Sequence, residues 1–334
     1  MPSRLTRFTR LAVAGGLLAF IFSYVPVEGV VTRFADVRSL PLLAALLATL
    51  LSRLVSAIQF KYLTDVQHMN VSLPRIFYIN SATSFYQLFL PGYISGGAIR
   101  WQKLAAGADN ADKALSVIVA SRLFDSIVAV VWMLTMFTAD TAAWADGYPA
   151  AGKLLVGALI AIPLACVFVK HQQRFGAVLH NRLAGNGKAN LGKLSWVVDK
   201  LARALLNFNS LTTSQLAVTV GLLSLYHLFG ALSWYYLAIG LDVNVPLLAI
   251  IWIRIFIYLA TLIPISFSGL GVREGLLIVL LAPFGIGSSS AMALALMLLS
   301  LSIAIGLLGG VLEAVVMTLG TPQTAPTSKR REKR

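Results

Sequence analysis

Charged residues are scarce in this chain: only 12% of its 334 residues are Asp, Glu, Lys or Arg, whereas 58% are hydrophobic. This balance excludes a soluble protein, because one soluble core cannot hide so much apolar surface. Long apolar runs must therefore face lipid, and the short polar stretches between them indicate one compact helical bundle. The runs lie near residues 11–25, 40–58, 115–138, 151–169, 214–240, 246–265, 272–286 and 290–318.

Cysteine and catalytic motifs are also lacking. Cys166 is the single cysteine, so neither a disulfide framework nor a thiolate metal site is available. The sequence contains no Walker loop, no clustered histidines and carboxylates for a metal, and no G-x-S-x-G elbow. We therefore expect no enzyme, no cofactor and no metal, and any transport must be passive or ion-coupled rather than driven by ATP.

Acidic residues number 13 against 27 lysines and arginines, and the basic excess is unevenly placed. It does not follow an aromatic-studded soluble face, so we expect no nucleic-acid partner. It lies before the first apolar run, in the stretch 170–210 and at the C-terminus, and the positive-inside rule places all three in the cytoplasm. The loop around Asp140 and Asp146 contains no Lys or Arg before Lys153, which predicts the opposite side.

Termini on the same side require an even number of membrane crossings, and we expect six to eight transmembrane helices. The stretch 74–94 is only half apolar, so it suits a re-entrant segment buried in protein better than a lipid-exposed helix. Runs 246–265 and 272–286 are either two crossings or two half-membrane arms. The sequence thus predicts an all-α integral membrane bundle, with one polytopic domain over residues 1–320 and a basic cytoplasmic tail over 321–334.

An internal repeat links two breaks in the hydrophobic pattern. From Pro91 the chain reads PGYISGGAIR, and from Pro264 it reads PISFSGLGVR. The two segments share proline, Ser-Gly and arginine at equivalent positions, and the apolar runs before them, 40–58 and 214–240, are expected to cross the membrane in opposite directions. This pattern predicts an inverted repeat, and in transporters such interrupted segments mark a binding site at the repeat interface.

Each break is expected to leave backbone polar groups unpaired at membrane depth, because proline removes a donor while glycine and serine permit irregular backbone. Arg100 and Arg273 follow the two breaks, and a guanidinium group suits a phosphate or carboxylate that leaves water. In the alternative, both arginines merely snorkel to the surface as topology anchors. We predict nonhelical backbone at Ser95, Gly96, Ser268 and Gly269.

Other charged or titratable residues lie within apolar runs. Arg122 and Asp125 are three residues apart and share a helix face, as a structural ion pair or as part of a transport site. Arg254 has few nearby acids in the sequence, and Glu313 is either an interfacial charge or the partner of an arginine across the bundle. His227 is either a hydrogen-bonded core histidine or a proton relay.

Three segments carry a family resemblance: NSATSFYQLFLPGYISGGAIR from Asn80, SVIVASRLFDS from Ser116 and PISFSGLGVREG from Pro264. They resemble the transmembrane flippase region of the lysylphosphatidylglycerol synthase family and its stand-alone relatives, over nearly the whole chain. Many members have an acidic residue where this chain has Ala98, which argues against a charge-paired role there. The full synthase has a soluble aminoacyl-transfer domain after this region, so the resemblance here implies lipid translocation without lipid synthesis.

We therefore expect a flippase-like transporter in the bacterial inner membrane, which moves an anionic or aminoacylated phospholipid or a polyprenyl-phosphate lipid without ATP hydrolysis. The alternative is a membrane-embedded scaffold that holds a lipid for a separate lipid or glycolipid synthase, and a membrane transferase acting on a lipid phosphate is a weaker third. A lipid is the expected partner, and a lipid-synthesis enzyme or a second copy of the chain stays open. The predicted substrate-binding residues are Arg100, Arg273, Ser95, Gly96, Gly97, Ser268, Gly269, Glu274, Arg122 and Asp125.

Overall fold

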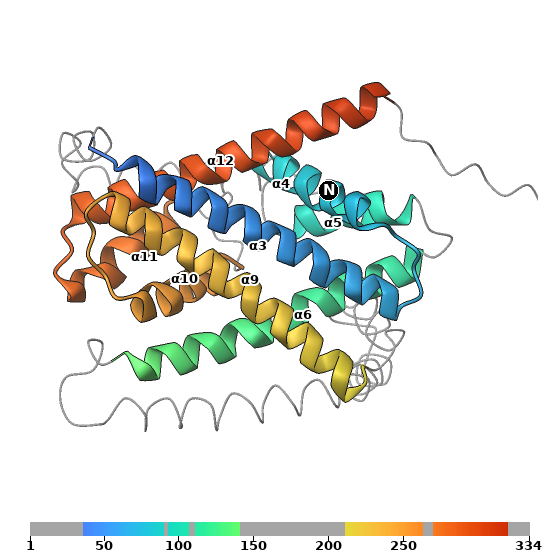
Figure 1. Cartoon of the computed structure of the whole chain (residues 1–334), viewed down its shortest axis with the longest axis horizontal. Helices are drawn as coiled ribbons and strands as arrows, with labels where there is room; N and C mark the ends of the chain where they lie inside the picture. Colours follow the sequence, from blue (N-terminus) through green and yellow to red (C-terminus); the bar gives the residue numbers. More distant parts are fainter. Residues whose placement is uncertain (1–35, 90–92, 107–110, 141–210, 263–269, 320–334) are drawn as a thin grey trace, which may run out of the picture.

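The computed structural model describes residues 36–89, 93–106, 111–140, 211–262 and 270–319, and within them it contains helices and no strand (Figure 1). The first half of this part holds α3 (Ser39–Val66), α4 (Leu73–Phe89), α5 (Tyr93–Ala105) and α6 (Ala111–Ala139). The second half holds α9 (Thr213–Gly240), α10 (Leu247–Leu262), α11 (Val272–Leu281), the short 3₁₀ turn η1 (Ala282–Phe284) and α12 (Ser288–Leu319).

Four helices in the described part, α3, α6, α9 and α12, are long and apolar enough to cross a membrane. They have 28 to 32 residues each, and at 1.5 Å per residue this exceeds the ~30 Å hydrocarbon thickness. Leucines such as Leu43 and Leu47 on α3 and Leu308 on α12 are exposed on their outer faces, where lipid would cover them. The fold is therefore an all-α membrane bundle, as predicted, while the apolar runs 11–25 and 151–169 lie outside the described residues.

The remaining helices form two interrupted pairs. α4, α5, α10 and α11 have 17, 13, 16 and 10 residues, each fewer than the ~20 that a full crossing needs. Pro91 lies between α4 and α5, and Pro264 lies between α10 and α11. α4 and α5 lie toward the end of the bundle where α3 ends, whereas α10 and α11 lie toward the opposite end (Figure 1). The lengths thus favour half-membrane arms over two crossings in the second pair.

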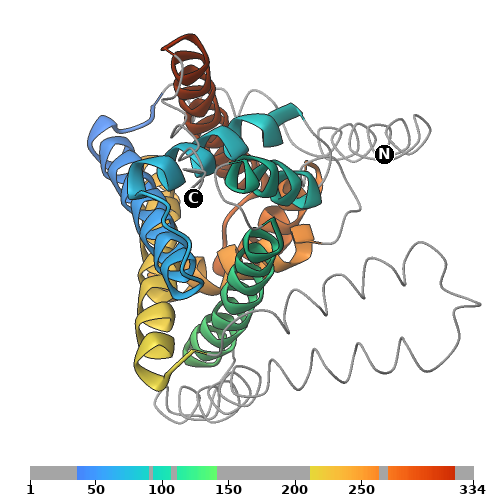
Figure 2. The same ribbon diagram turned by 90° about the vertical axis from the view of Figure 1, so that its right-hand side faces the viewer.

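The neighbours of each helix repeat between the two halves. α3 packs along α9, its counterpart in the other half. In the first half α3 contacts α4 and α5 contacts α6, and in the second half α9 contacts α10 and α11 contacts α12. Between the halves, α4 contacts α12 and α10 contacts α6. From the end of the bundle, α3 and α9 lie side by side on one flank and α6 lies on the other (Figure 2). This arrangement is an approximate twofold repeat of four helices.

The two halves run in opposite directions because α3 and α9 are antiparallel. The Thr49 and Ser233 hydroxyl oxygens are 2.7 Å apart, and Ser52 donates to the Tyr226 carbonyl at 3.1 Å. Position numbers thus rise along α3 as they fall along α9. The fold therefore contains the inverted repeat predicted from the two proline breaks.

The prediction of nonhelical backbone at Ser95 and Gly96 is wrong, because both lie inside α5, which begins at Tyr93. The break falls just before these residues, so they occupy the first turn of a helix, whose N–H groups lack intrahelical partners. The element therefore still presents backbone donors, but at a helix N-terminus. Ser268 and Gly269 lie outside the described residues.

Close packing of α12 on α4 depends on glycine at position 309. A Cβ atom on Gly309 would overlap the backbone carbonyl of Ser81, which cannot swing away as a long side chain could. We expect Gly309→Ala to lower the free energy of unfolding by about 1–3 kcal/mol through overpacking, although alanine is the better helix former. Thermal unfolding of the purified protein in detergent measures the change.

Gly221→Ala is the matched control, because a Cβ atom there meets nothing within 4 Å. It should leave the melting temperature unchanged or raise it slightly. Equal melting temperatures for Gly309→Ala and Gly221→Ala would show that α12 does not need this close approach.

Candidate functional site

A cavity of about 810 Å³ lies between the two halves. Its volume is within the usual range for ligand sites, about 300–1,000 Å³. Five arginines line it, one each from α3, α5, α6, α10 and α11, and serine, asparagine and glutamine side chains lie among them. The arginines are Arg53, Arg100, Arg122, Arg254 and Arg273.

The α12 wall of the cavity is largely apolar, with Ser302 as its polar residue among the described ones. Leu298, Leu301 and Ile305 line it together with Ile303 and Leu307, and the last two are 40% and 51% exposed. Leu308 and Val311, next along α12, are 56% and 61% exposed, so apolar residues extend along this helix beyond the cavity. The cavity is therefore amphipathic, with arginines on several sides and a hydrocarbon-like wall on another.

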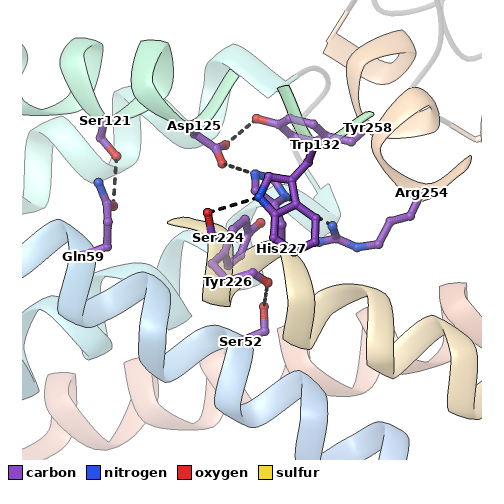
Figure 3. Close-up of polar contacts among 10 residues, drawn as sticks. All are labelled: Ser52, Gln59, Ser121, Asp125, Trp132, Ser224, Tyr226, His227, Arg254 and Tyr258. Carbon is purple, nitrogen blue, oxygen red and sulfur yellow. Dashed lines mark hydrogen bonds and ion pairs between the residues drawn. The ribbon is translucent and has the colours of Figure 1, made fainter. Parts of the chain in front are cut away.

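A polar network joins α6, α9 and α10 beside this cavity (Figure 3). Tyr258 donates to Asp125 Oδ2 at 2.6 Å, and His227 Nε2 lies 3.2 Å from Asp125 Oδ1. Arg254 Nη1 lies 3.4 Å from His227 Nδ1. Because arginine can only donate, Nδ1 accepts and Nε2 carries the hydrogen of a neutral ring, close to Asp125 Oδ1 but without a hydrogen bond to it. These contacts favour a hydrogen-bonded core histidine.

Asp125 was expected to pair with Arg122, three residues earlier on the same helix. Both residues line the cavity. The carboxylate oxygens, however, contact Tyr258 and His227 from two other helices. The residues that hold Asp125 are therefore distant in sequence, and local spacing could not identify them.

Arg273 stands at the start of α11, where Gly271 has a positive φ of 81°. Glu274, which is fully buried, accepts from the Gly271 N–H at 2.7 Å through Oε2 and from Arg273 Nη2 at 2.6 Å through Oε1. Glu274 therefore caps the helix and positions the guanidinium. It does not line the cavity, so the structure makes it a support for Arg273 rather than one of the wall residues.

Arg100 lies on α5, with its guanidinium carbon 5.0 Å from the centre of the Phe60 ring of α3. This cation–π contact holds the charge toward the bundle rather than toward the surrounding surface. Gly96 packs against the Gln87 side chain of α4. Neither Gly96 nor Gly97 belongs to the described cavity wall, and the Ser95 side chain lies outside the described part of the chain.

A second buried charge pair joins the C-terminal parts of α5 and α12. Lys103 Nζ on α5 lies 2.6 Å from Glu313 Oε1 on α12, and Lys103 also donates to the Tyr78 hydroxyl at 3.0 Å. Tyr86 donates to the same Glu313 oxygen at 3.0 Å. Glu313 thus pairs across the bundle, as one sequence alternative held, but with a lysine instead of an arginine.

Two tyrosine–carboxylate contacts join helices that the inverted repeat relates, although the two carboxylates stand at different positions along α6 and α12. Tyr86 of α4 reaches Glu313 of α12, and Tyr258 of α10 reaches Asp125 of α6. Each contact joins the interrupted pair of one half to the last helix of the other half. Each half is therefore linked to the other by a tyrosine–carboxylate contact between the same kinds of helix.

Sequence analysis did not single out Arg53 and Lys103. Arg53 stands inside the apolar run 40–58 and hydrogen-bonds Ser84, and a charge at such a place costs about 2.5–3.5 kcal/mol on insertion scales. That cost could have identified Arg53 from the sequence as a residue with a buried role. Lys103 carried no such signal, because it follows the apolar segment and reads as a cytoplasmic loop charge. In the described part of the chain, no group of His, Cys, Asp and Glu could hold a metal ion.

Residues 7–310 match the model of the family described as Lysylphosphatidylglycerol synthase TM region. The chain belongs to this family. The match covers both halves of the repeat and all five cavity arginines, so the resemblance carried by the three sequence segments is confirmed. No curated protein matches the chain significantly. The family is one of membrane regions associated with lipid, which agrees with the amphipathic cavity.

Proposed function

We propose that the protein is a flippase-like lipid transporter that moves lipids across the bilayer without ATP hydrolysis. The observation that carries this proposal is the amphipathic cavity between two inverted halves. Its arginines can shelter an anionic headgroup, and its largely apolar α12 wall adjoins exposed apolar residues of the same helix. A lipid could thus place its headgroup inside while its acyl or isoprenoid chains remain in the bilayer.

The chemistry of the headgroup site follows from its arginines. A phosphate that leaves water must regain hydrogen bonds and an opposite charge, and a guanidinium supplies both through its fork of donors. Because the five arginines come from both halves, a bound phosphate can contact both halves at once. Movement of one half against the other would then expose the same site to either leaflet, as in other inverted-repeat transporters.

Transport by the purified protein alone tests this proposal. Liposomes containing a fluorescent phosphatidylglycerol, or in a parallel series a fluorescent phosphatidic acid, are treated with a membrane-impermeant quencher. Protein-containing liposomes should lose fluorescence beyond the outer-leaflet fraction, because lipid from the inner leaflet reaches the outside. Protein-free liposomes and heat-denatured protein are the controls.

A scaffold for a separate synthase would use the same cavity to hold a lipid without moving it. In that case the lipid binds to the purified protein, but only the outer-leaflet fraction is quenched. That result would contradict the transporter and support the scaffold.

A bacterial inner-membrane protein of this design should have both termini and the 170–210 stretch in the cytoplasm, and the Asp140–Pro149 loop outside, according to its basic residues. With Cys166 replaced by alanine, single cysteines at positions 186 and 329 should react with an impermeant thiol reagent only after the membrane is opened. A cysteine at position 146 should react in intact cells. Labelling of positions 186 and 329 from opposite sides would refute this topology.

A further inference from the structure

The charge of the cavity wall is strongly unbalanced. Five arginines line the cavity, whereas Asp125 is the one carboxylate among the described residues of its wall. Both oxygens of that carboxylate already have close neighbours, because Tyr258 donates to Oδ2 and His227 Nε2 lies 3.2 Å from Oδ1. Asp125 is therefore poorly placed to receive a cationic group from a ligand.

None of the other described carboxylates lines the cavity, and only Glu274 contacts a cavity arginine, Arg273. Asp36 and Asp112 are exposed, and Asp140 accepts from the Trp252 ring nitrogen at 2.9 Å. The remaining four pair with basic side chains: Asp65 with Lys61, Asp242 with Arg38, Glu274 with Arg273 and Glu313 with Lys103. Within the described part of the chain, no second carboxylate faces the cavity.

This imbalance discriminates between headgroups. Several guanidinium groups around one low-dielectric space repel one another, and each negative charge on a ligand reduces that repulsion. A phosphate diester carries one negative charge, whereas a phosphate monoester or a diphosphate carries more and offers more acceptor oxygens. An aminoacylated headgroup adds an ammonium group, which would meet further cations instead of a carboxylate.

We infer that the cavity selects lipids whose headgroup carries more than one negative charge, a phosphate monoester or a diphosphate, over phosphate diesters and over aminoacylated headgroups. The inference rests on the proposed function only in taking the ligand to be a lipid. It narrows the substrate to lipid phosphates and diphosphates. It also predicts that lysylphosphatidylglycerol, the lipid after which the family is named, is a poor ligand of this cavity.

Two nearly isosteric lipids test the charge alone. Dioleoyl phosphatidic acid and dioleoyl phosphatidylmethanol differ by one methyl group and by the second ionisable oxygen, and dioleoyl lysylphosphatidylglycerol supplies the cationic headgroup. Dissociation constants are measured for the full-length protein in a nonionic detergent at constant ionic strength. Phosphatidic acid should bind roughly tenfold more tightly than phosphatidylmethanol, the effect of about one charge-assisted hydrogen bond, and lysylphosphatidylglycerol should bind most weakly.

Arginine variants place that selectivity in the cavity. Arg53→Gln and Arg254→Gln each remove one cavity charge from a different half, and each should reduce the preference for phosphatidic acid severalfold. Arg38→Gln is the matched control, because Arg38 lies at the surface with its side chain 57% exposed, and it should leave the preference intact. Melting profiles show which variants are folded. If a glutamine variant does not fold, the corresponding lysine variant is measured instead, because it keeps the charge and removes only the bidentate donors of arginine.

The outcomes separate this inference from the proposed function. Equal affinities for phosphatidic acid and phosphatidylmethanol, both reduced in the arginine variants, would refute the selectivity while leaving a lipid site in the cavity. Tightest binding of lysylphosphatidylglycerol would also refute it. If the cavity variants bind every lipid as the parent does, the cavity is not the headgroup site, and the proposed function loses the observation that carries it.

Discussion

Glu313→Gln is expected to lower the free energy of unfolding by about 3 kcal/mol, near the lower end of the range for breaking a buried ion pair. The Glu313 side chain is 4% exposed and its partner Lys103 is 20% exposed. If one charge is removed, water therefore cannot readily solvate the charge that remains. Glutamine keeps the shape and can still accept from Tyr86, so the change isolates the loss of the negative charge. Unfolding of the detergent-solubilised protein by heat or denaturant measures it.

The exposed pair Lys61 and Asp65 provides the matched control. These residues also form a lysine–carboxylate pair, but their side chains are 29% and 48% exposed. Asp65→Asn should therefore cost no more than about 0.5 kcal/mol.

A double variant, Lys103→Gln with Glu313→Gln, tests whether the two charges act as a pair. It should be less destabilised than the sum of the single variants, because neither charge is then left alone. Equal costs for Glu313→Gln and Asp65→Asn would show that the Lys103–Glu313 contact between α5 and α12 stabilises the protein no more than an exposed ion pair does.

Arg100→Gln and Arg273→Gln should each weaken binding of an anionic lipid by roughly 1.5–3 kcal/mol, the scale of a hydrogen bond to a charged group. Both arginines line the cavity, and each is held in place, Arg100 over the Phe60 ring and Arg273 by Glu274. Lysine should rescue only partly, because it keeps the charge and loses the planar fork. Lipid binding and reconstituted transport both measure the effect.

The snorkelling alternative predicts a different pattern for these variants. If the arginines only anchor topology, lysine replaces either one freely, and the glutamine variants chiefly change insertion or orientation. Arg273→Gln also leaves the buried Glu274 without its cation, so folded yield must be measured beside transport. Parental transport in all four folded variants would show that these arginines do not bind the lipid.

The two proline motifs show how far local sequence reasoning reaches. Pro91 and Pro264 correctly predicted two interrupted helix pairs, because proline and glycine act on the backbone where they stand. The same reasoning went wrong at Ser95 and Gly96, which lie inside α5. The helix begins at Tyr93, directly after Pro91 and Gly92, and helix formation then satisfies backbone groups that an irregular segment would leave unpaired.

The sequence by itself predicted the membrane class and the inverted repeat. It also identified Arg100 and Arg273 as candidate site residues. Hydropathy is a local property that sums along the chain, and a repeated motif can be found without knowing where its copies lie in space. The sequence also flagged Arg122, Asp125, Arg254 and Glu313, because a charge inside an apolar run is costly and needs a reason.

Only the tertiary structure decided which of these groups meet. Arg53 and Arg254 are 201 positions apart and line one cavity, and Lys103 finds Glu313 across the bundle. His227, Tyr258 and Asp125 come together from three helices. No periodicity or motif records such contacts, because they depend on how the two antiparallel halves pack. The sequence thus determined that buried charges exist, and packing decided which charges are paired with one another and which are gathered around a shared space.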